Sequence, residues 1–223
     1  MTLQVGCFDV NTVDMDTPRR RATYHHGDLP EALLAASELL IAERGVEAFS
    51  LREAARRVGV DPAACYRHFR DRDGVIFALA RRGFTRLATR MERIVAREAN
   101  AEAALRAFAR EYVRFAVQRP ADFRVMFGPK ALPPRSARVR GEYERGPFDI
   151  LVKTVSIWRG RGLDEKPTRV DERTAMGLWA IAHGVANLTA DGAWGLDRRA
   201  SERVLDDLLD QLLRDPAELR GAR

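Results

Sequence analysis

Residues 50–69 read SLREAARRVGVDPAACYRHF, and this stretch decides the fold. Two short segments with helical spacing of apolar residues, 51–58 and 62–69, are separated only by a three-residue turn that begins at Gly59. A residue without Cβ is the one that adopts a positive φ at low cost, so Gly59 suits a sharp change of direction. Asp61 followed by Pro62 is a helix start signal, an N-cap and then proline at the first helical position. The pattern predicts a helix-turn-helix.

The first of these two helices carries its own start signal. Ser50 stands at the N-cap position and Glu53 three residues later, which is the pattern of a capping box. We expect the Ser50 hydroxyl to accept a hydrogen bond from the amide of Glu53, and the Glu53 carboxylate to accept one from the amide of Ser50.

Helical spacing continues through most of the remaining chain, and no segment has the alternating β-branched pattern of a strand. Gly45, Asp71 and Pro120 mark helix ends or starts. The chain is therefore predicted to be all-α, with about nine helices. The predicted ranges are 28–44, 51–58, 62–69, 72–97, 101–119, 121–127, 147–159, 171–190 and 197–214.

Charge and composition divide the chain into three parts. Residues 1–18 contain three aspartates and no cation, and are predicted to form a disordered tail, with Met15 a second candidate for the start of translation. Residues 19–74 form a three-helix domain with the helix-turn-helix, and residues 75–223 a second helical domain. Within the latter, residues 128–147 hold four prolines and three glycines and read as a loop.

Composition excludes several classes of protein. Two cysteines cannot build a disulfide framework, and their spacing fits no zinc site. The longest uncharged run, 174–190, has 17 residues and is too short and polar to cross a membrane. The N-terminus has no secretory signal, so we expect a cytoplasmic protein with no membrane partner. No catalytic triad, phosphate-binding loop or metal-ligand spacing is present, so neither an enzyme nor a cofactor is predicted.

The helix-turn-helix supplies candidate DNA contacts. The second helix presents small side chains and a guanidinium that can approach base edges in the major groove. The residues expected there are Pro62, Ala63, Ala64 and Arg67. Candidate phosphate donors surround them: Ser50, Arg52, Tyr66, His68 and Arg72. The formal net charge of +6 agrees with a polyanionic partner but does not require one. The alternative is a helical hairpin that only packs within a bundle.

The same residues resemble a known family. The stretch from His26 to Gly74 is similar to the DNA-binding domain of TetR-type transcriptional repressors, and its most specific part is Tyr66-x-His68-Phe69 after the Gly-Val turn. The resemblance implies a homodimeric, all-helical repressor that binds an operator in double-stranded DNA and a small molecule in its C-terminal domain. Asp61 and Ala64 depart from the family pattern, since polar uncharged groups often contact DNA at these positions.

The C-terminal half resembles the family's domain type named for Trp, His and Gly, through Trp179-x3-His183-Gly184. Trp179 and His183 lie one helical turn apart and face the same way. His183 is either the polar anchor of a ligand pocket or a core histidine bonded to a carbonyl. In the first case the pocket for a largely apolar effector is lined by Phe108, Phe115, Met126, Trp158, Trp179 and His183.

The last two predicted helices, 171–190 and 197–214, are apolar over a wide arc. A helix of this kind must bury a second face, and a homodimer with a four-helix interface would cover it. The alternative is a larger core within a single chain, which the length of the chain disfavours. The sequence thus predicts a ligand-responsive repressor that binds a palindromic operator as a homodimer. The alternatives are an activator, a ligand-independent DNA-binding protein, or a helical small-molecule-binding or catalytic domain.

Overall fold

The computed structural model describes residues 29–128, 146–193, 195 and 197–213, and over these residues it contains nine helices and no strand. The helices are α1 (Leu29–Arg44), α2 (Leu51–Val58), α3 (Pro62–Cys65), α4 (Arg72–Val95), α5 (Ala101–Gln118), α6 (Pro120–Phe127), α8 (Pro147–Trp158), α9 (Arg169–Ala190) and α10 (Arg198–Leu212). The all-α prediction is confirmed. The predicted tail, the first residues of the 19–74 segment and most of the 128–147 loop lie outside the described residues.

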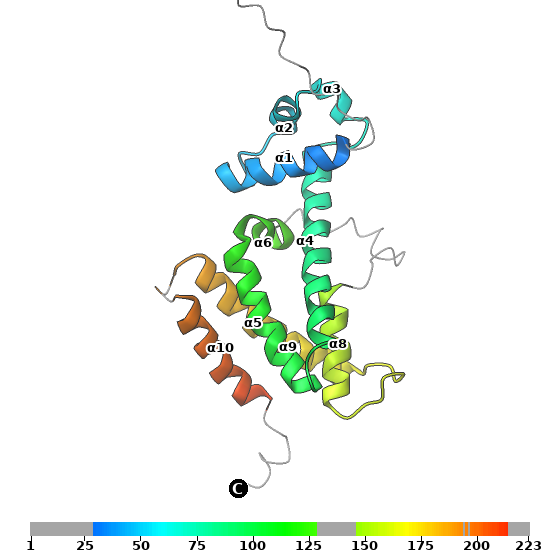
Figure 1. Ribbon diagram of the computed structural model, residues 1–223, viewed down its shortest axis with the longest axis vertical. Coiled ribbons are helices and arrows are strands. Elements are labelled where there is room, and N and C mark those ends of the chain that lie inside the picture. The colour runs from blue at the N-terminus through cyan, green and yellow to red at the C-terminus, as the bar shows by residue number, and fades with distance from the viewer. Residues whose placement is uncertain (1–28, 129–145, 194, 196, 214–223) are drawn as a thin grey trace, which may run out of the picture.

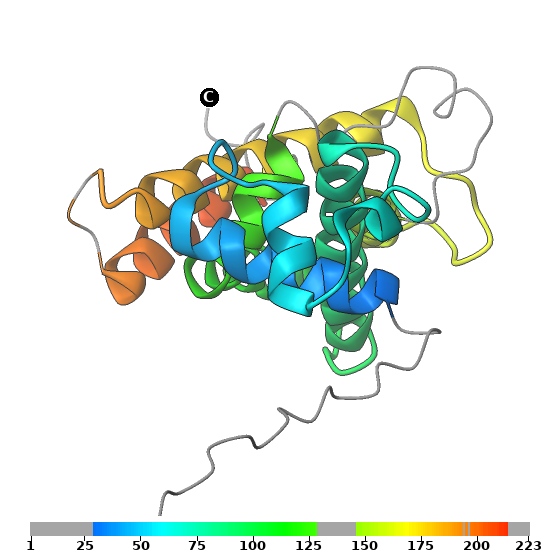
Figure 2. The same cartoon turned by 90° about the horizontal axis from the view of Figure 1, so that it is seen from above.

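The helices form two groups joined by α4 (Figure 1). Helices α1, α2 and α3 lie together at one end of the molecule. Helix α4 begins among them and runs into a bundle made with α5, α6, α8, α9 and α10. Seen from above, the three N-terminal helices lie across the end of this bundle (Figure 2). No helix in the described residues is both long enough and apolar enough to span a bilayer.

Two hydrophobic cores correspond to these groups, and α4 contributes to both. Its first half, including Ile76 and Leu79, packs with α1, α2 and α3, whereas its second half, including Leu87 and Met91, packs with the C-terminal helices. Helix α6 also reaches the N-terminal core, because Val125 is buried there. The predicted domain boundary between residues 74 and 75 therefore falls near the start of a helix that belongs to both cores. This boundary stays a prediction.

The helix-turn-helix forms at the predicted place. Gly59 has φ of +80° and ends α2, and the amide of Val60 donates to the carbonyl of Ala55 at 3.0 Å. Asp61 caps α3, since its Oδ1 accepts a hydrogen bond from the amide of Ala63 at 2.7 Å. The position of α3 relative to α2 is thus fixed by one left-handed glycine and one side-chain cap.

Two local predictions are wrong. Ser50 is the N-cap of α2 but its hydroxyl makes no capping bond, and the Glu53 carboxylate pairs with Arg44 of α1 at 2.6 Å instead of with the amide of Ser50. The sequence also predicts a second helix over 62–69, but the α-helix ends at Cys65. The next residues form a turn in which the amide of His68 donates to the carbonyl of Cys65 at 3.0 Å, an i→i+3 bond that tightens the chain.

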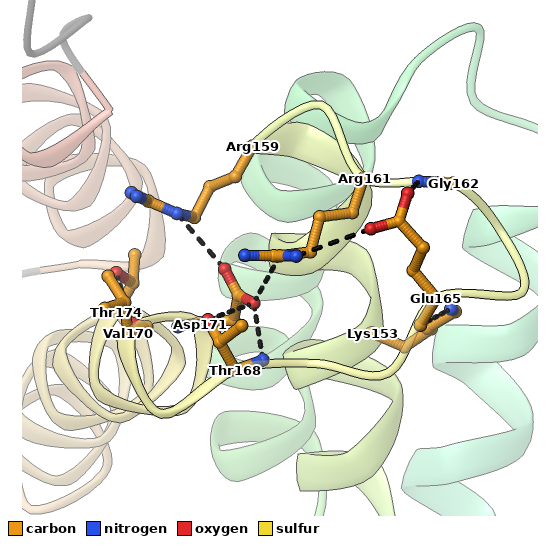
Figure 3. A network of polar contacts seen from close by, with 9 residues as sticks. All are labelled: Lys153, Arg159, Arg161, Gly162, Glu165, Thr168, Val170, Asp171 and Thr174. Atoms are coloured by element: carbon orange, nitrogen blue, oxygen red, sulfur yellow. Dashed lines mark hydrogen bonds and ion pairs between the residues drawn. The ribbon is translucent and has the colours of Figure 1, made fainter.

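A buried carboxylate fixes the junction between α8 and α9 (Figure 3). Asp171 is fully buried, and its Oδ2 accepts hydrogen bonds from the backbone amide and the hydroxyl of Thr168, both at 2.7 Å. Arg161 Nε approaches Oδ2 and Arg159 Nε approaches Oδ1, each at 3.1 Å. Helix α9 consequently starts at Arg169, two residues earlier than predicted, because Thr168 and Asp171 form a capping box that the sequence analysis did not assign.

We predict that Asp171→Asn lowers the free energy of unfolding by about 2 kcal/mol, since a neutral amide cannot accept charge-assisted bonds equally well and the guanidinium groups of Arg159 and Arg161 lose their shared carboxylate. Urea unfolding measures this change. Glu172→Gln, the neighbouring exposed carboxylate, is the matched control and should stay within about 0.5 kcal/mol of the unsubstituted protein. Equal stability of the two variants would contradict the role of Asp171.

The same contacts make this contribution depend on pH. Burial alone raises the pKa of Asp171, but the hydrogen bonds from Thr168 and the charges of Arg161 and Arg159 outweigh burial and hold it below its usual value. A lowered folded-state pKa stabilises the protein above the unfolded-state value of about 4. The stability difference between the unsubstituted protein and Asp171→Asn should therefore shrink as the pH falls below about 4.

Candidate nucleic-acid interface and ligand pocket

The tip of the helix-turn-helix is open to solvent. Ala63 and Arg67 are exposed, as reading of base edges requires, while Cys65 on the opposite side is fully buried in the N-terminal core. Pro62 and Ala64 are half-buried. The candidate phosphate donors Arg52, Tyr66 and His68 are exposed as well, with Tyr66 exposed by 49% although it is a large aromatic side chain.

Ion pairs sort the arginines around this tip into two groups. Arg44 and Arg57 are neutralised by Glu53 and Glu43, each at 2.6 Å, and the hydrogen bond from Arg57 lowers the pKa of Glu43. A second group is exposed and has no acidic partner within the described part of the chain. This group is Arg52, Arg56, Arg67, Arg70 and Arg81.

Three of these arginines, Arg56, Arg70 and Arg81, are not among the DNA contacts predicted from the sequence. Arg56 lies one helical turn after Arg52 on α2, and Arg70 follows the turn after α3. The spacing of Arg52 and Arg56 was the only available signal, because which arginines are neutralised depends on contacts with α1. Unpaired guanidinium groups are the ones that can exchange solvent for phosphate oxygens without losing an existing ion pair.

Arg72, a predicted phosphate contact, is held by the protein itself. Its Nε donates to the carbonyl of Phe49 at 3.1 Å, and its Nη2 donates to the carbonyl of Val46. Its side chain is one-third exposed. The guanidinium therefore ties the start of α4 to the loop between α1 and α2. Its remaining nitrogen, Nη1, lies 3.7 Å from Oδ1 of Asp73, and a contact of Arg72 with phosphate stays a prediction.

A cavity of about 760 Å³ lies within the C-terminal bundle. Three predicted pocket residues line it: Phe108, Met126 and Trp179. Phe115 is instead fully buried in the core, and Trp158 packs against that core from the end of α8. The wall also includes residues that the sequence analysis did not assign, among them Phe84, Tyr112, Phe127 and Phe148. Tyr112 stands four residues after Phe108 on α5, so the helical period could have indicated it.

His183 lies behind the wall, in a chain of polar contacts. Trp179 Nε1 donates to the hydroxyl oxygen of Tyr112 at 3.2 Å, and that oxygen lies 2.8 Å from Nδ1 of His183. The His183 ring also packs on Phe127, with ring centroids 4.7 Å apart. Burial lowers the pKa of His183, and burial raises the pKa of Tyr112 against the opposing effect of the Trp179 hydrogen bond. His183 Nδ1 is therefore bonded to a hydroxyl and not to a carbonyl, and His183 itself is not among the residues that line the cavity. Its role as a polar anchor for a ligand stays a prediction.

No metal centre accompanies these features: the described residues contain no group of three or more His, Cys, Asp or Glu side chains placed to hold a metal ion.

We predict that Arg72→Ala lowers the free energy of unfolding by about 1–2 kcal/mol, because two loop carbonyls lose a charged donor. Chemical denaturation of the full chain measures this change. Arg70→Ala is the control, since Arg70 is exposed and unpaired and its loss should leave stability nearly unchanged. If both variants were as stable as the unsubstituted protein, Arg72 would not hold the loop.

Two family models match this chain. One, described as "Bacterial regulatory proteins, tetR family", matches residues 33–79 and so covers the helix-turn-helix. The other, described as "Tetracyclin repressor-like, C-terminal domain", matches residues 105–212, which include most of the pocket wall. No curated protein matches the chain.

Solved structures show the same fold over nearly the whole chain. A protein of unknown function from a Rhodococcus species is 34% identical, with a TM-score of 0.70, and the match covers 86% of this chain and 97% of that one. PfmR, a TetR family transcriptional regulator from Thermus thermophilus, is 19% identical with a TM-score of 0.55, and the match covers 82% and 98% of the two chains. The helix-turn-helix, the matched models and this fold together show that the chain belongs to the TetR family of transcriptional regulators.

Proposed function

We propose that this regulator is a homodimeric repressor, acting in the cytoplasm, which binds a palindromic operator and releases it when a small apolar molecule occupies the pocket. The observation that carries the proposal is the exposed tip of α3, where Ala63 and Arg67 are uncovered and unpaired arginines surround them. Guanidinium groups around a bare helix end supply phosphate contacts, and the helix end supplies base contacts.

A path from the pocket to the DNA-binding end supports the response to a ligand. Met126 and Phe127 of α6 line the pocket, whereas Val125 of the same helix is buried in the N-terminal core. Arg86 of α4 pairs with Asp122 of α6 at 2.9 Å and with Glu38 of α1 at 3.0 Å. A ligand that moves α6 must therefore disturb α1 and α4. It shifts the protein between two arrangements only if it binds one of them more tightly.

One structural neighbour shows that this fold can hold both kinds of partner. AibR, 19% identical with a TM-score of 0.58, was solved in complex with isovaleryl coenzyme A and operator DNA, and the match covers 82% of this chain and 97% of that one. That ligand and that operator belong to AibR, and its similarity to this chain shows a shared fold only.

An incompletely covered face on α9 and α10 supports the homodimer. Ala180 and Gly184 are exposed on α9, and Leu212 of α10 is 38% exposed despite its size. Val204 and Leu208 of α10 are only half-buried. Small residues allow a second helix to approach closely, and the apolar side chains beside them gain from being covered. A twofold pairing through this face would give the regulator two α3 tips for a palindromic site.

The DNA-binding proposal is tested by selecting bound fragments from a genomic library and then measuring affinity for an enriched fragment at two salt concentrations. Tyr66→Phe should weaken binding to every duplex, and Arg52→Ala should also flatten the salt dependence by about one phosphate contact. Arg93→Ala, an exposed arginine on the C-terminal half of α4, is the control and should bind as the unsubstituted protein does. The absence of any enriched sequence would refute the proposal.

The dimer is tested by Gly184→Leu. A Cβ at Gly184 meets nothing within 4 Å in the single chain, so the substitution should fold normally but obstruct the approach of a second copy. We expect light scattering to show a shift from dimer to monomer and the affinity for a palindromic site to fall. Arg93→Leu places the same side chain on another exposed helix surface and should remain dimeric. A fully dimeric Gly184→Leu would place the interface elsewhere.

A further inference from the structure

The wall of the pocket offers a bound molecule very few polar atoms. Among the described residues that line it, only Tyr112, Trp179 and Asp149 have an oxygen or a nitrogen in the side chain. Asp149 is exposed, and its Oδ2 accepts a hydrogen bond from the amide of Gly146 at 3.0 Å. The hydrogen bonds that side chains can offer inside the pocket therefore depend on Tyr112 and Trp179.

The only N–H of the Trp179 side chain is already used. The indole nitrogen is a donor without a lone pair to offer, and it donates to the hydroxyl oxygen of Tyr112. Trp179 thus contributes an aromatic surface and no free hydrogen-bonding group to a ligand.

The proton of the Tyr112 hydroxyl is used as well. His183 is neutral at physiological pH, because burial lowers its pKa, so one of its ring nitrogens is an acceptor. A phenol is a stronger acid than a neutral imidazole N–H, and an imidazole nitrogen is a stronger base than a phenol oxygen. The 2.8 Å contact is therefore best satisfied with Tyr112 donating to Nδ1 of His183. The donation from Trp179 reinforces this direction, since hydrogen bonds in a chain polarise one another.

One lone pair on the Tyr112 oxygen remains. A hydroxyl has one proton and two lone pairs, of which His183 takes the proton and Trp179 takes one lone pair. We propose that the pocket selects an uncharged, chiefly apolar molecule whose polar group donates a hydrogen bond to Tyr112 Oη, a long-chain alcohol being the simplest example. This assignment rests on the proposed function, since it names the chemical class of the effector.

Other classes fit the wall less well. A carboxylate would lose its hydration without gaining a cation, because no Lys, Arg or His is among the described lining residues. An ammonium group would need a buried anion, and Asp149 is exposed at the edge. A molecule that only accepts hydrogen bonds, such as an ether or an ester, would bring its lone pairs against that of Tyr112.

Calorimetric titration of the full chain without DNA tests the assignment with three probes of equal chain length: 1-decanol, 1-methoxydecane and decanoate. We expect decanoate to bind at least tenfold more weakly than 1-decanol. In Tyr112→Phe the affinity for 1-decanol should fall while that for the ether stays the same, so that the ratio of the two changes by about three- to tenfold. Phe84→Leu is the matched control. It alters an apolar part of the wall and should change both affinities by the same factor.

A second variant tests whether Tyr112 donates its proton to His183. In His183→Phe the Tyr112 proton is released and can be donated to a ligand, so the affinity for 1-methoxydecane should rise. If His183 has only a structural role, His183→Phe should lower the affinities for 1-decanol and 1-methoxydecane by the same factor.

Three results would overturn the assignment: an unchanged alcohol-to-ether ratio in Tyr112→Phe, decanoate binding as tightly as 1-decanol, or no binding of either neutral probe up to its solubility limit. Each is distinct from failure of the proposed function. If the protein enriches an operator sequence but the titrations give one of these results, only the assignment of the ligand class is refuted. If the protein binds 1-decanol but enriches no DNA sequence, the proposed function is refuted instead.

Discussion

One helix belongs to both hydrophobic cores, and the rest of the molecule is arranged around that constraint. Ile76 and Leu87 lie three turns apart on α4, yet the first packs with the helix-turn-helix and the second with the pocket-bearing bundle. Where α4 passes α6, a Cβ on Gly83 would come within 2.5 Å of Sδ of Met126. Two bodies that share a closely packed rigid element resist independent reorientation, and this constraint is the physical basis of the proposed coupling between the pocket and the DNA-binding end.

Charge pairing decides which part of the surface remains available to a polyanion. The chain carries 38 cationic residues against 32 acidic ones, so composition alone indicates little beyond a modest excess. The structure is more informative, because Glu53, Glu43 and Glu38 form ion pairs with Arg44 of α1, Arg57 of α2 and Arg86 of α4. The cations left over include those of α2 and of the turn after α3. The effective charge of the DNA-binding end is therefore a property of the fold more than of the sequence.

The predictions that succeeded depended on neighbours in the sequence. Helix periods, the left-handed glycine at position 59 and the Asp61 and Asp71 caps are set within a few residues, and each formed as expected. Two local signals were nevertheless misjudged, the extent of α3 and the capping box of Thr168 and Asp171. Other features depended on distant neighbours: the Glu53 carboxylate pairs with Arg44 of α1, and Arg72 reaches carbonyls more than twenty residues away.

The pocket was only partly predictable for the same reason. Helical spacing identified Phe108 and Trp179, but it could not separate wall residues from core residues such as Phe115, which differ in what faces them across the bundle. The contact between Tyr112 and His183 joins residues 71 positions apart, and no pattern within either helix predicts it. The sequence therefore indicated helices that form the pocket but only some of the residues that line it.

The brevity of α3 limits how much information a single chain can extract from DNA. Its four residues rise by about 6 Å, less than two steps of a duplex with about 3.4 Å between successive pairs. Direct discrimination by one subunit then extends over two or three neighbouring pairs, even with help from the turn that follows. In the homodimer proposed above, the remaining selectivity would come from groove width, from bendability and from the distance between half-sites. Base changes at positions that the protein does not touch would then act through the stiffness and shape of the duplex.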